Sequence, residues 1–251
     1  RNKLMLMNLE VTNIFARNQA SFYPVVHFDQ RKDKLVKMDF TANNTDLTAD
    51  VIEDTKKFTV YIQSKLKSLR ATFGIGGYGE HRMVYSRSRV FDAPSENDEP
   101  RRLHLGTDIW GPAGTPVYAA LGGMIHGFAF NDHFGDYGAT LIVWHQLDGF
   151  PFYTLYGHLS LADIQRLSEG DYVIRGQEIA HFGEPRENGH WPPHLHFQII
   201  LDIGMNRGDY PGVCRFSEKA KYLANCPDPD LILQLNRFIE PGDSWQMTVD
   251  G

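Results

Sequence analysis

The first regular pattern in the chain is an alternation of apolar and polar side chains over residues 34–40. Val36, Met38 and Phe40 fall on one face of an extended segment, because successive side chains of a strand point to opposite sides. This alternation predicts a β-strand with one buried face.

A helical period follows between Thr48 and Leu69. Thr48 is suited to cap the first turn, and the acidic residues just after it lie where the positive end of the helix dipole stabilises negative charge. We therefore expect one helix over residues 48–69. Its buried stripe is formed by apolar residues at helical spacing, namely Val51, Phe58, Ile62, Leu66 and Leu69.

The pattern changes after the polar, proline-containing segment 92–100, which we interpret as an exposed loop at a domain boundary. From residue 103 to about 201, short apolar runs are bounded by Gly, Pro or Asp, as in antiparallel sheets. These runs cover residues 116–120, 140–145, 152–156 and 194–201.

The pattern as a whole predicts a mainly β fold built on an antiparallel β-sheet. We expect this β domain over residues 101–205, after a mixed α/β N-terminal extension over residues 1–100. Residues 206–251 then form a C-terminal extension that packs on the core, with a short helix at 231–238.

Gly74, Gly76 and Gly79 satisfy the G-x-G-x-x-G pattern of dinucleotide-binding proteins. That pattern signals a nucleotide site only when a strand precedes it and a helix follows it. Here the predicted helix precedes the glycines, and residues 81–91 after them read as extended. We therefore expect a glycine-rich connection that binds no nucleotide.

Charge and hydropathy narrow the possible partners. The formal net charge is −6, from 25 Lys and Arg against 31 Asp and Glu, and no basic run of five interrupts the chain. Such a chain lacks the basic surface of a nucleic-acid-binding protein. No apolar stretch approaches the roughly 20 residues that cross a bilayer, so no membrane span is expected.

The first fifteen residues contain no apolar core followed by a small-residue cleavage site, which favours a cytoplasmic location. The chain does not begin with Met, however, so an envelope location after removal of a leader stays open. Cys214 and Cys226 lie in no C-x-x-C pattern, and we expect two thiols rather than one bridge. The oligomeric state is left open.

Eleven histidines are present, and several of them fall in three groups. His104 precedes Asp108 by four positions, and the glycines and prolines that follow favour a strand end that runs into a turn over a helix. His194, His196 and Gln198 would share one face of a strand. The third group is His158, which follows Gly157 at the end of an apolar run.

A chemically complete set for a hydrolase is formed by five of these residues, namely His104, Asp108, His158, His194 and His196. Two His and one carboxylate suit catalytic zinc, because three protein ligands leave a coordination position open. Zinc lowers the pKa of a bound water to roughly 7 and so supplies a nucleophile at neutral pH. Two further histidines can guide the proton of that water and stabilise the developing oxyanion.

At these residues the sequence resembles the M23 peptidases, the lysostaphin-type zinc endopeptidases that cut peptidoglycan cross-links in bacterial cell walls. The family's H-x-x-x-D motif matches His104 and Asp108, its H-x-H motif matches His194 and His196, and its Tyr-x-His-Leu setting matches His158. The glycine framework between these motifs also agrees. The resemblance covers about residues 103–201.

The resemblance implies an M23-type domain with one Zn²⁺ held by His104, Asp108 and His196. It implies catalytic roles for His158 and His194, and leaves open which of them is the base and which stabilises the oxyanion. The substrate would be a peptide or peptidoglycan, with the cleaved bond left open.

Residues 131–137 and the loop before His194 would form the walls of a substrate groove. Tyr137, His190 and Trp191 are the candidate substrate contacts. The loop 185–193 departs from the family's Gly- and Ser-rich turn, which bears on specificity and leaves the metal site intact.

Three alternatives were weighed against this interpretation. A catalytically inactive M23-like binding or regulatory protein is disfavoured because every ligand and catalytic position is filled. Non-haem iron oxygenases use an H-x-D/E pair, and phosphoryl carriers have no use for Asp108. Of the remaining histidines, five have structural or surface roles in this interpretation, namely His126, His133, His145, His181 and His190, of which His190 is also a candidate substrate contact.

Residues 1–100 are too extensive for a linker. They are expected either to pack across the groove and limit access to it or to dock another protein.

Overall fold

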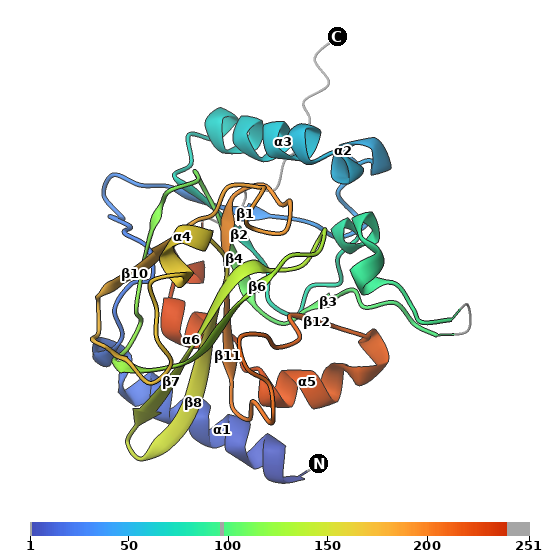
Figure 1. Ribbon diagram of the computed structural model, residues 1–251. Helices are drawn as coiled ribbons and strands as arrows, with labels where there is room; N and C mark the ends of the chain where they lie inside the picture. Colours follow the sequence, from blue (N-terminus) through green and yellow to red (C-terminus); the bar gives the residue numbers. More distant parts are fainter. Residues whose placement is uncertain (1, 96–97, 240–251) are drawn as a thin grey trace.

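An eight-stranded sheet forms the centre of the computed structural model, which describes residues 2–95 and 98–239 (Figure 1). All neighbouring strands are antiparallel except the first pair, β1 and β2. In spatial order the strands are β1 (Leu35–Met38), β2 (Phe73–Gly76), β4 (Thr107–Trp110), β11 (His194–Ile200), β8 (Phe150–Leu159), β7 (Gly138–Leu147), β6 (Gly123–Asn131) and β9 (Tyr172–Val173). The mainly β, antiparallel fold class is confirmed.

Two small antiparallel pairs complete the strands of the described residues. The pairs are β10 (Glu178–His181) with β5 (Pro116–Tyr118), and β12 (Val213–Cys214) with β3 (Leu103–His104). The α-helices are α1 (Asn2–Arg17), α2 (Ala49–Glu53), α3 (Thr55–Ser68), α4 (Leu161–Ile164), α5 (Lys219–Asn225) and α6 (Asp230–Leu233). The 3₁₀ turns are η1 (Gln19–Ser21), η2 (Val84–Arg87), η3 (Arg89–Phe91), η4 (Phe216–Glu218) and η5 (Asn236–Phe238).

The N-terminal extension continues the sheet of the β domain. β2 pairs with β4 in antiparallel register, and β1 pairs with β2. The predicted strand at 34–40 is confirmed in β1, and Val36, Met38 and Phe40 are buried as expected. Residues of the extension therefore lie next to the strand that carries Asp108.

The single helix predicted over 48–69 is wrong, because the chain breaks at Asp54 into α2 and α3. The Asp54 carboxylate accepts hydrogen bonds from the backbone N–H groups of Lys56 and Lys57 and so caps α3. The break shifts the buried face of the first turns, where Ile52 is buried and Val51 only half-buried. Figure 1 shows α2 and α3 at one end of the molecule and α1 at the other.

The glycine-rich segment is also more regular than predicted. Gly74 and Gly76 belong to β2, and a Cβ at Gly74 would lie 2.6 Å from Cγ of Met38. Glycine is therefore required by close packing in the sheet. The extended structure predicted for residues 81–91 is wrong, because most of this segment forms η2 and η3.

The chain ends differ in detail from the pattern-based expectation. The short helix predicted at 231–238 is split into α6 and η5, since Gln234 adopts a left-handed conformation between them. The pattern did not predict α1, whose Phe15 ring packs 4.8 Å from that of Phe152. Cys214 and Cys226 are buried free thiols, as expected. Within the described ranges, no helix has the length and apolarity needed to cross a bilayer.

His145 in β7 is a buried structural histidine. Its Nδ1 lies 3.0 Å from the carbonyl oxygen of Gly122, and its Nε2 lies 2.7 Å from Oγ1 of Thr154. Burial lowers the pKa of His145 from 6.5 to about 4. The folded protein therefore keeps this ring neutral across a range in which a solvent-exposed histidine gains a proton.

We expect this difference to make stability depend on pH. Between pH 6.5 and 4 the unfolded chain binds a proton at His145 that the folded chain does not bind, so the free energy of unfolding falls as pH drops through this window. In His145→Gln protein, the loss of unfolding free energy across this window should be smaller by up to about 3 kcal/mol. Urea unfolding at one pH above the window and at one within it measures this difference. Parallel losses of stability in the two proteins would show that His145 has no such role.

Candidate metal centre

Neighbouring strands bring His104, Asp108 and His196 together. His104 ends β3, Asp108 lies in β4, and His196 lies opposite Asp108 in the antiparallel register of β11. The predicted strand end at His104 is confirmed, whereas Asp108 lies within a strand instead of a turn. A Cβ at Gly106 would lie 2.5 Å from the His196 ring, so glycine lets the connection pass close to this imidazole.

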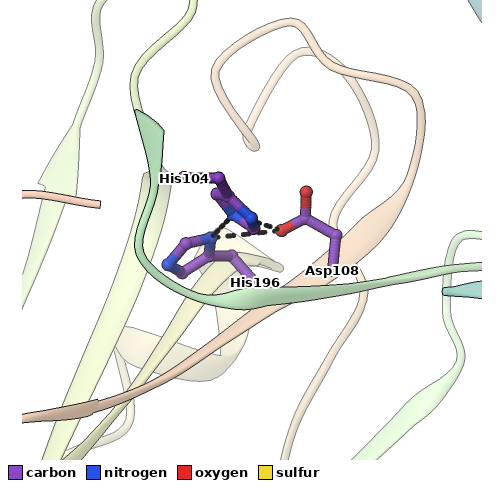
Figure 2. A group of neighbouring side chains, drawn as sticks. All are labelled: His104, Asp108 and His196. Atoms are coloured by element: carbon purple, nitrogen blue, oxygen red, sulfur yellow. Dashed lines mark hydrogen bonds and ion pairs between the residues drawn. The ribbon is translucent and has the colours of Figure 1, made fainter. Parts of the chain in front are cut away.

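The potential ligand atoms of these three residues face one point. Nε2 of His104 lies 3.0 Å from Nδ1 of His196, and Oδ1 of Asp108 lies 3.2 Å and 3.1 Å from these two nitrogens. Figure 2 shows both rings turned toward the same carboxylate oxygen. All three side chains are buried, and together they form a group able to hold a metal ion.

Hydrogen bonds on the far sides of the two rings indicate which nitrogens carry protons. Nδ1 of His104 lies 3.0 Å from the carbonyl oxygen of Gly77, and Nε2 of His196 lies 2.8 Å from Oε1 of Gln198. Each neutral ring therefore donates outward, and its other nitrogen presents a lone pair to the centre. Two lone pairs and a carboxylate oxygen then face each other, and they repel one another unless a cation lies among them.

Zinc fits this donor set. Two imidazoles and one carboxylate are the ligands of catalytic zinc sites, and zinc–ligand distances of about 2.0–2.1 Å place tetrahedral ligand atoms roughly 3.3 Å apart. The separations of 3.0–3.2 Å are close to that value. The outward hydrogen bonds of both rings are also typical of metal-binding histidines, because they fix the tautomer and the ring orientation.

The surroundings of two of these ligand residues, Asp108 and His104, keep their ligand atoms unprotonated. Burial by itself would raise the pKa of Asp108, but His104 and Arg82 hold that pKa well below its ordinary range. Burial, aided by the positive charge of Arg82, lowers the pKa of His104 to about 4. Near neutral pH the centre therefore offers an ionised carboxylate and a neutral His104.

His158 and His194 lie side by side next to the ligand group. Their ring centroids are 4.1 Å apart, and Nε2 of His194 lies 4.0 Å from Oδ1 of Asp108. Nδ1 of His158 lies 2.8 Å from the carbonyl oxygen of Asn188, and Nδ1 of His194 lies 2.7 Å from that of Pro192. Both rings thus donate from Nδ1, which leaves Nε2 available for a reacting group.

The environment of these two histidines keeps them neutral and fixed. Burial lowers the pKa of His194 to about 4 and that of His158 well below 6.5. Trp110 stacks on His194 with ring centroids 3.8 Å apart. His158 itself has a left-handed φ of 63°, whereas Gly157 serves close packing, since a Cβ there would lie 2.6 Å from Tyr137. Such strained backbone is common at functional sites.

Of the three candidate substrate contacts, Tyr137 and Trp191 lie at the site and His190 lies at the surface. Tyr137 and Trp191 line a cavity of about 160 Å³ together with His158, His194 and His196. The hydroxyl group of Tyr137 lies 3.4 Å from Nε2 of His196. His190 is not among the described residues that line this cavity. Its side chain is exposed, and its ring stacks on that of Phe134 with centroids 5.6 Å apart. Substrate contact by Tyr137, Trp191 and His190 stays a prediction.

Part of the N-terminal extension forms one wall of the cavity. Four of the wall residues come from η2 and η3, namely Val84, Tyr85, Val90 and Phe91. The volume of 160 Å³ is below the about 300–1,000 Å³ typical of ligand pockets. That residues 1–100 limit access to the site, or instead dock another protein, stays a prediction.

Opening this wall should change the choice of substrate. Phe91→Ala removes a buried ring whose centroid lies 4.7 Å from that of the Tyr85 ring. We expect the ratio of the hydrolysis rate of a cross-linked peptide to that of a dipeptide to rise several-fold. Phe130→Ala, at a partly exposed ring in β6, is the matched control. Rates on both substrate sizes would be compared by mass spectrometry. An unchanged ratio in folded Phe91→Ala protein would exclude this wall as the barrier.

Some residues of the site carry no obvious mark in the sequence. Gln198 was placed on the strand face of His194 and His196, so the alternation of β11 contained a signal for its role. Arg82 lies 26 positions before Asp108 and donates from Nη1 to Oδ2 of that carboxylate. No local pattern connects those two positions.

Comparison with known proteins agrees with this geometry. Residues 102–207 match the model of peptidase family M23. The chain is 34% identical over 117 residues to the peptidoglycan DD-endopeptidase ShyA of Vibrio cholerae, covering 43% of this chain and 24% of that protein. It is 36% identical over 103 residues to the DD-carboxypeptidase/endopeptidase Mpg of Neisseria meningitidis, covering 40% of this chain and 21% of that protein.

Among solved structures, a zinc-containing peptidase from Vibrio cholerae matches with 33% identity and a TM-score of 0.30, covering 39% of this chain and 27% of that one. The chain thus spans less than a third of the length of each of these three proteins. The family match contains His104, Asp108, His158, His194 and His196, and with them all three histidine motifs. Residues 102–207 are therefore the part of the chain that matches peptidase family M23.

Proposed function

We propose that this chain is a zinc-dependent endopeptidase that hydrolyses peptide bonds in peptidoglycan cross-links or in related peptides with glycine or D-amino acids. The observation that carries the proposal is the convergence of two imidazole lone pairs and one carboxylate oxygen beside two further histidines with free Nε2 atoms. The similarity to ShyA, a peptidoglycan DD-endopeptidase, supports this substrate class.

His104, Asp108 and His196 would hold the zinc ion. Zinc, when bound, acts as a Lewis acid that polarises a scissile carbonyl and makes water nucleophilic at neutral pH. The chain itself contributes a buried environment around the three ligand side chains. Burial of the ligands strengthens their electrostatic interactions and excludes competing water.

His158 and His194 would manage the protons of the reaction. Each presents an Nε2 atom toward the cavity, because its Nδ1–H is held by a backbone carbonyl. One ring would orient the attacking water, accept its proton on Nε2 and then donate that proton to the leaving amine. The other ring would stabilise the oxyanion once it carries a proton on Nε2. Tyr137 supplies a further donor, since burial raises its pKa well above 10 and keeps its hydroxyl protonated.

Purified peptidoglycan and short synthetic peptides test this function. Zinc-loaded protein is incubated with peptidoglycan, with glycine-rich peptides and with peptides that contain D-amino acids, and the products are identified by mass spectrometry. We expect new amino termini at cross-link or stem-peptide bonds, and no products after treatment with a chelator. Binding of peptidoglycan without cleavage by zinc-loaded protein would contradict the proposal and favour a regulatory protein.

A further inference from the structure

Arg82 lies outside the family match, yet it contacts a proposed metal ligand. It follows β2 in the N-terminal extension, and its side chain is only 1% exposed. Its Nη1 donates to Oδ2 of Asp108. Building on the proposed function, we infer that Arg82 is a positioning residue that turns Oδ1 of Asp108 toward the metal and keeps Oδ2 away from it.

The two oxygens of the Asp108 carboxylate have different partners. Oδ1 lies 3.2 Å and 3.1 Å from the inward nitrogens of His104 and His196, whereas Oδ2 accepts from Arg82. A carboxylate without such a partner can rotate or offer both oxygens to a cation. The guanidinium group occupies Oδ2 and so leaves one oxygen with one orientation for the metal.

Arg82 is itself fixed by its other contacts. Its Nε donates to Oε2 of Glu80 at 2.8 Å, and its Nη1 lies 3.3 Å from the hydroxyl group of Tyr85. The guanidinium carbon lies 5.0 Å from the centre of the Phe40 ring. These partners use the donors that a substrate would need, so Arg82 acts through Asp108 and not by direct contact with substrate.

The end of β2 is shaped to accept this side chain and also holds a second ligand. A Cβ at Gly76 would lie 2.7 Å from Nη2 of Arg82, so a larger residue there would displace the guanidinium group from its present position. The carbonyl oxygen of Gly77 lies 3.3 Å from this Nη2 and 3.0 Å from Nδ1 of His104. The N-terminal extension thus forms hydrogen bonds with both His104 and Asp108, through atoms of these residues other than the proposed ligand atoms.

Arg87 provides a matched control for the loss of a buried arginine. It lies in η2, is 7% exposed, and its Nη2 donates to Oγ1 of Thr55 at 2.9 Å and to the carbonyl oxygen of His190 at 3.1 Å. Within residues 2–95 and 98–239, its hydrogen bonds involve no residue of the ligand group. Removing Arg87 should therefore disturb packing without releasing Asp108.

The experiment compares wild-type protein with Arg82→Met, Arg82→Lys and Arg87→Met. Zinc affinity is measured by competition with a chromophoric chelator, the visible spectrum is recorded with Co²⁺ in place of zinc, and the fold is checked by circular dichroism. Arg82→Met should bind zinc about 10–100-fold more weakly, the usual effect of losing a partner of a metal ligand. Its Co²⁺ spectrum should change, because Oδ2 becomes free to approach the ion.

The other variants sharpen this expectation. Arg82→Lys keeps the positive charge, but an ammonium group lacks the planar set of N–H donors that binds Glu80 and Asp108 at once. Its zinc affinity should therefore lie between those of Arg82→Met and wild-type protein. Arg87→Met should keep the wild-type affinity and spectrum.

Wild-type affinity and spectrum in folded Arg82→Met protein, or in Arg82→Lys protein if the former does not fold, would overturn the inference. Equal losses in the Arg82→Met and Arg87→Met proteins would overturn it too, because they would reflect general destabilisation. Failure of the wild-type protein itself to bind zinc would instead overturn the proposed function, before any substitution is considered.

Discussion

His196→Ala is expected to remove zinc and peptidase activity together. This ring supplies one of the three atoms that face the metal position, and it lies between Asp108 Oδ1 and the Gln198 amide. Loss of a ligand should weaken zinc binding more than loss of an outer partner, so we expect a fall in affinity of more than about 10²-fold. Metal content after dialysis and peptide hydrolysis are measured on the same sample.

The control for this substitution is His27→Ala, which removes an exposed imidazole that stacks on Tyr118. It should keep both zinc and activity, which excludes a general effect of losing a histidine. Stoichiometric zinc in dialysed His196→Ala protein would remove this residue from the ligand set.

His158→Ala should give the opposite combination, with zinc retained and activity lost. The imidazole packs 4.1 Å from His194, and its ring centroid lies 6.3 Å from that of His196, so it is next to the ligand group without belonging to it. A general acid–base group contributes about 10²–10⁴-fold to the rate, and we expect kcat to fall by at least about 10²-fold. Zinc content, kcat and KM are compared with those of wild-type protein.

A folded His158→Ala protein with full zinc and wild-type kcat would exclude a catalytic role for this residue. His194→Ala is the companion variant, since its ring shares the same Nδ1-to-carbonyl arrangement. Similar losses in both variants would fit a pair of histidines that exchange protons with water and oxyanion.

The sequence predicted the centre better than the elements around it. The alternation at His194, His196 and Gln198 required a strand face, and β11 has that face. His104 and Asp108 were assigned by their match to the H-x-x-x-D motif of the M23 peptidases, since their spacing alone also fits an ordinary turn. The structure brings both residues to one point with His196.

The errors arose where side chains or distant segments override local pattern. Asp54 divides the predicted helix because its carboxylate caps a new helix, a choice that apolar periodicity does not register. The contact of Arg82 with Asp108 depends on β2 pairing with β4, a pairing between regions that the sequence suggested to be separate. Tertiary pairing of that kind leaves no period in the chain.

The most direct test of the account is a zinc titration of metal-free protein followed by peptide hydrolysis. His104, Asp108 and His196 form one site, so activity should rise linearly with added zinc and reach its maximum at one equivalent per chain. Wild-type activity in metal-free protein, or tight binding of one zinc ion without any gain in hydrolysis, would contradict a peptidase centred on these three residues.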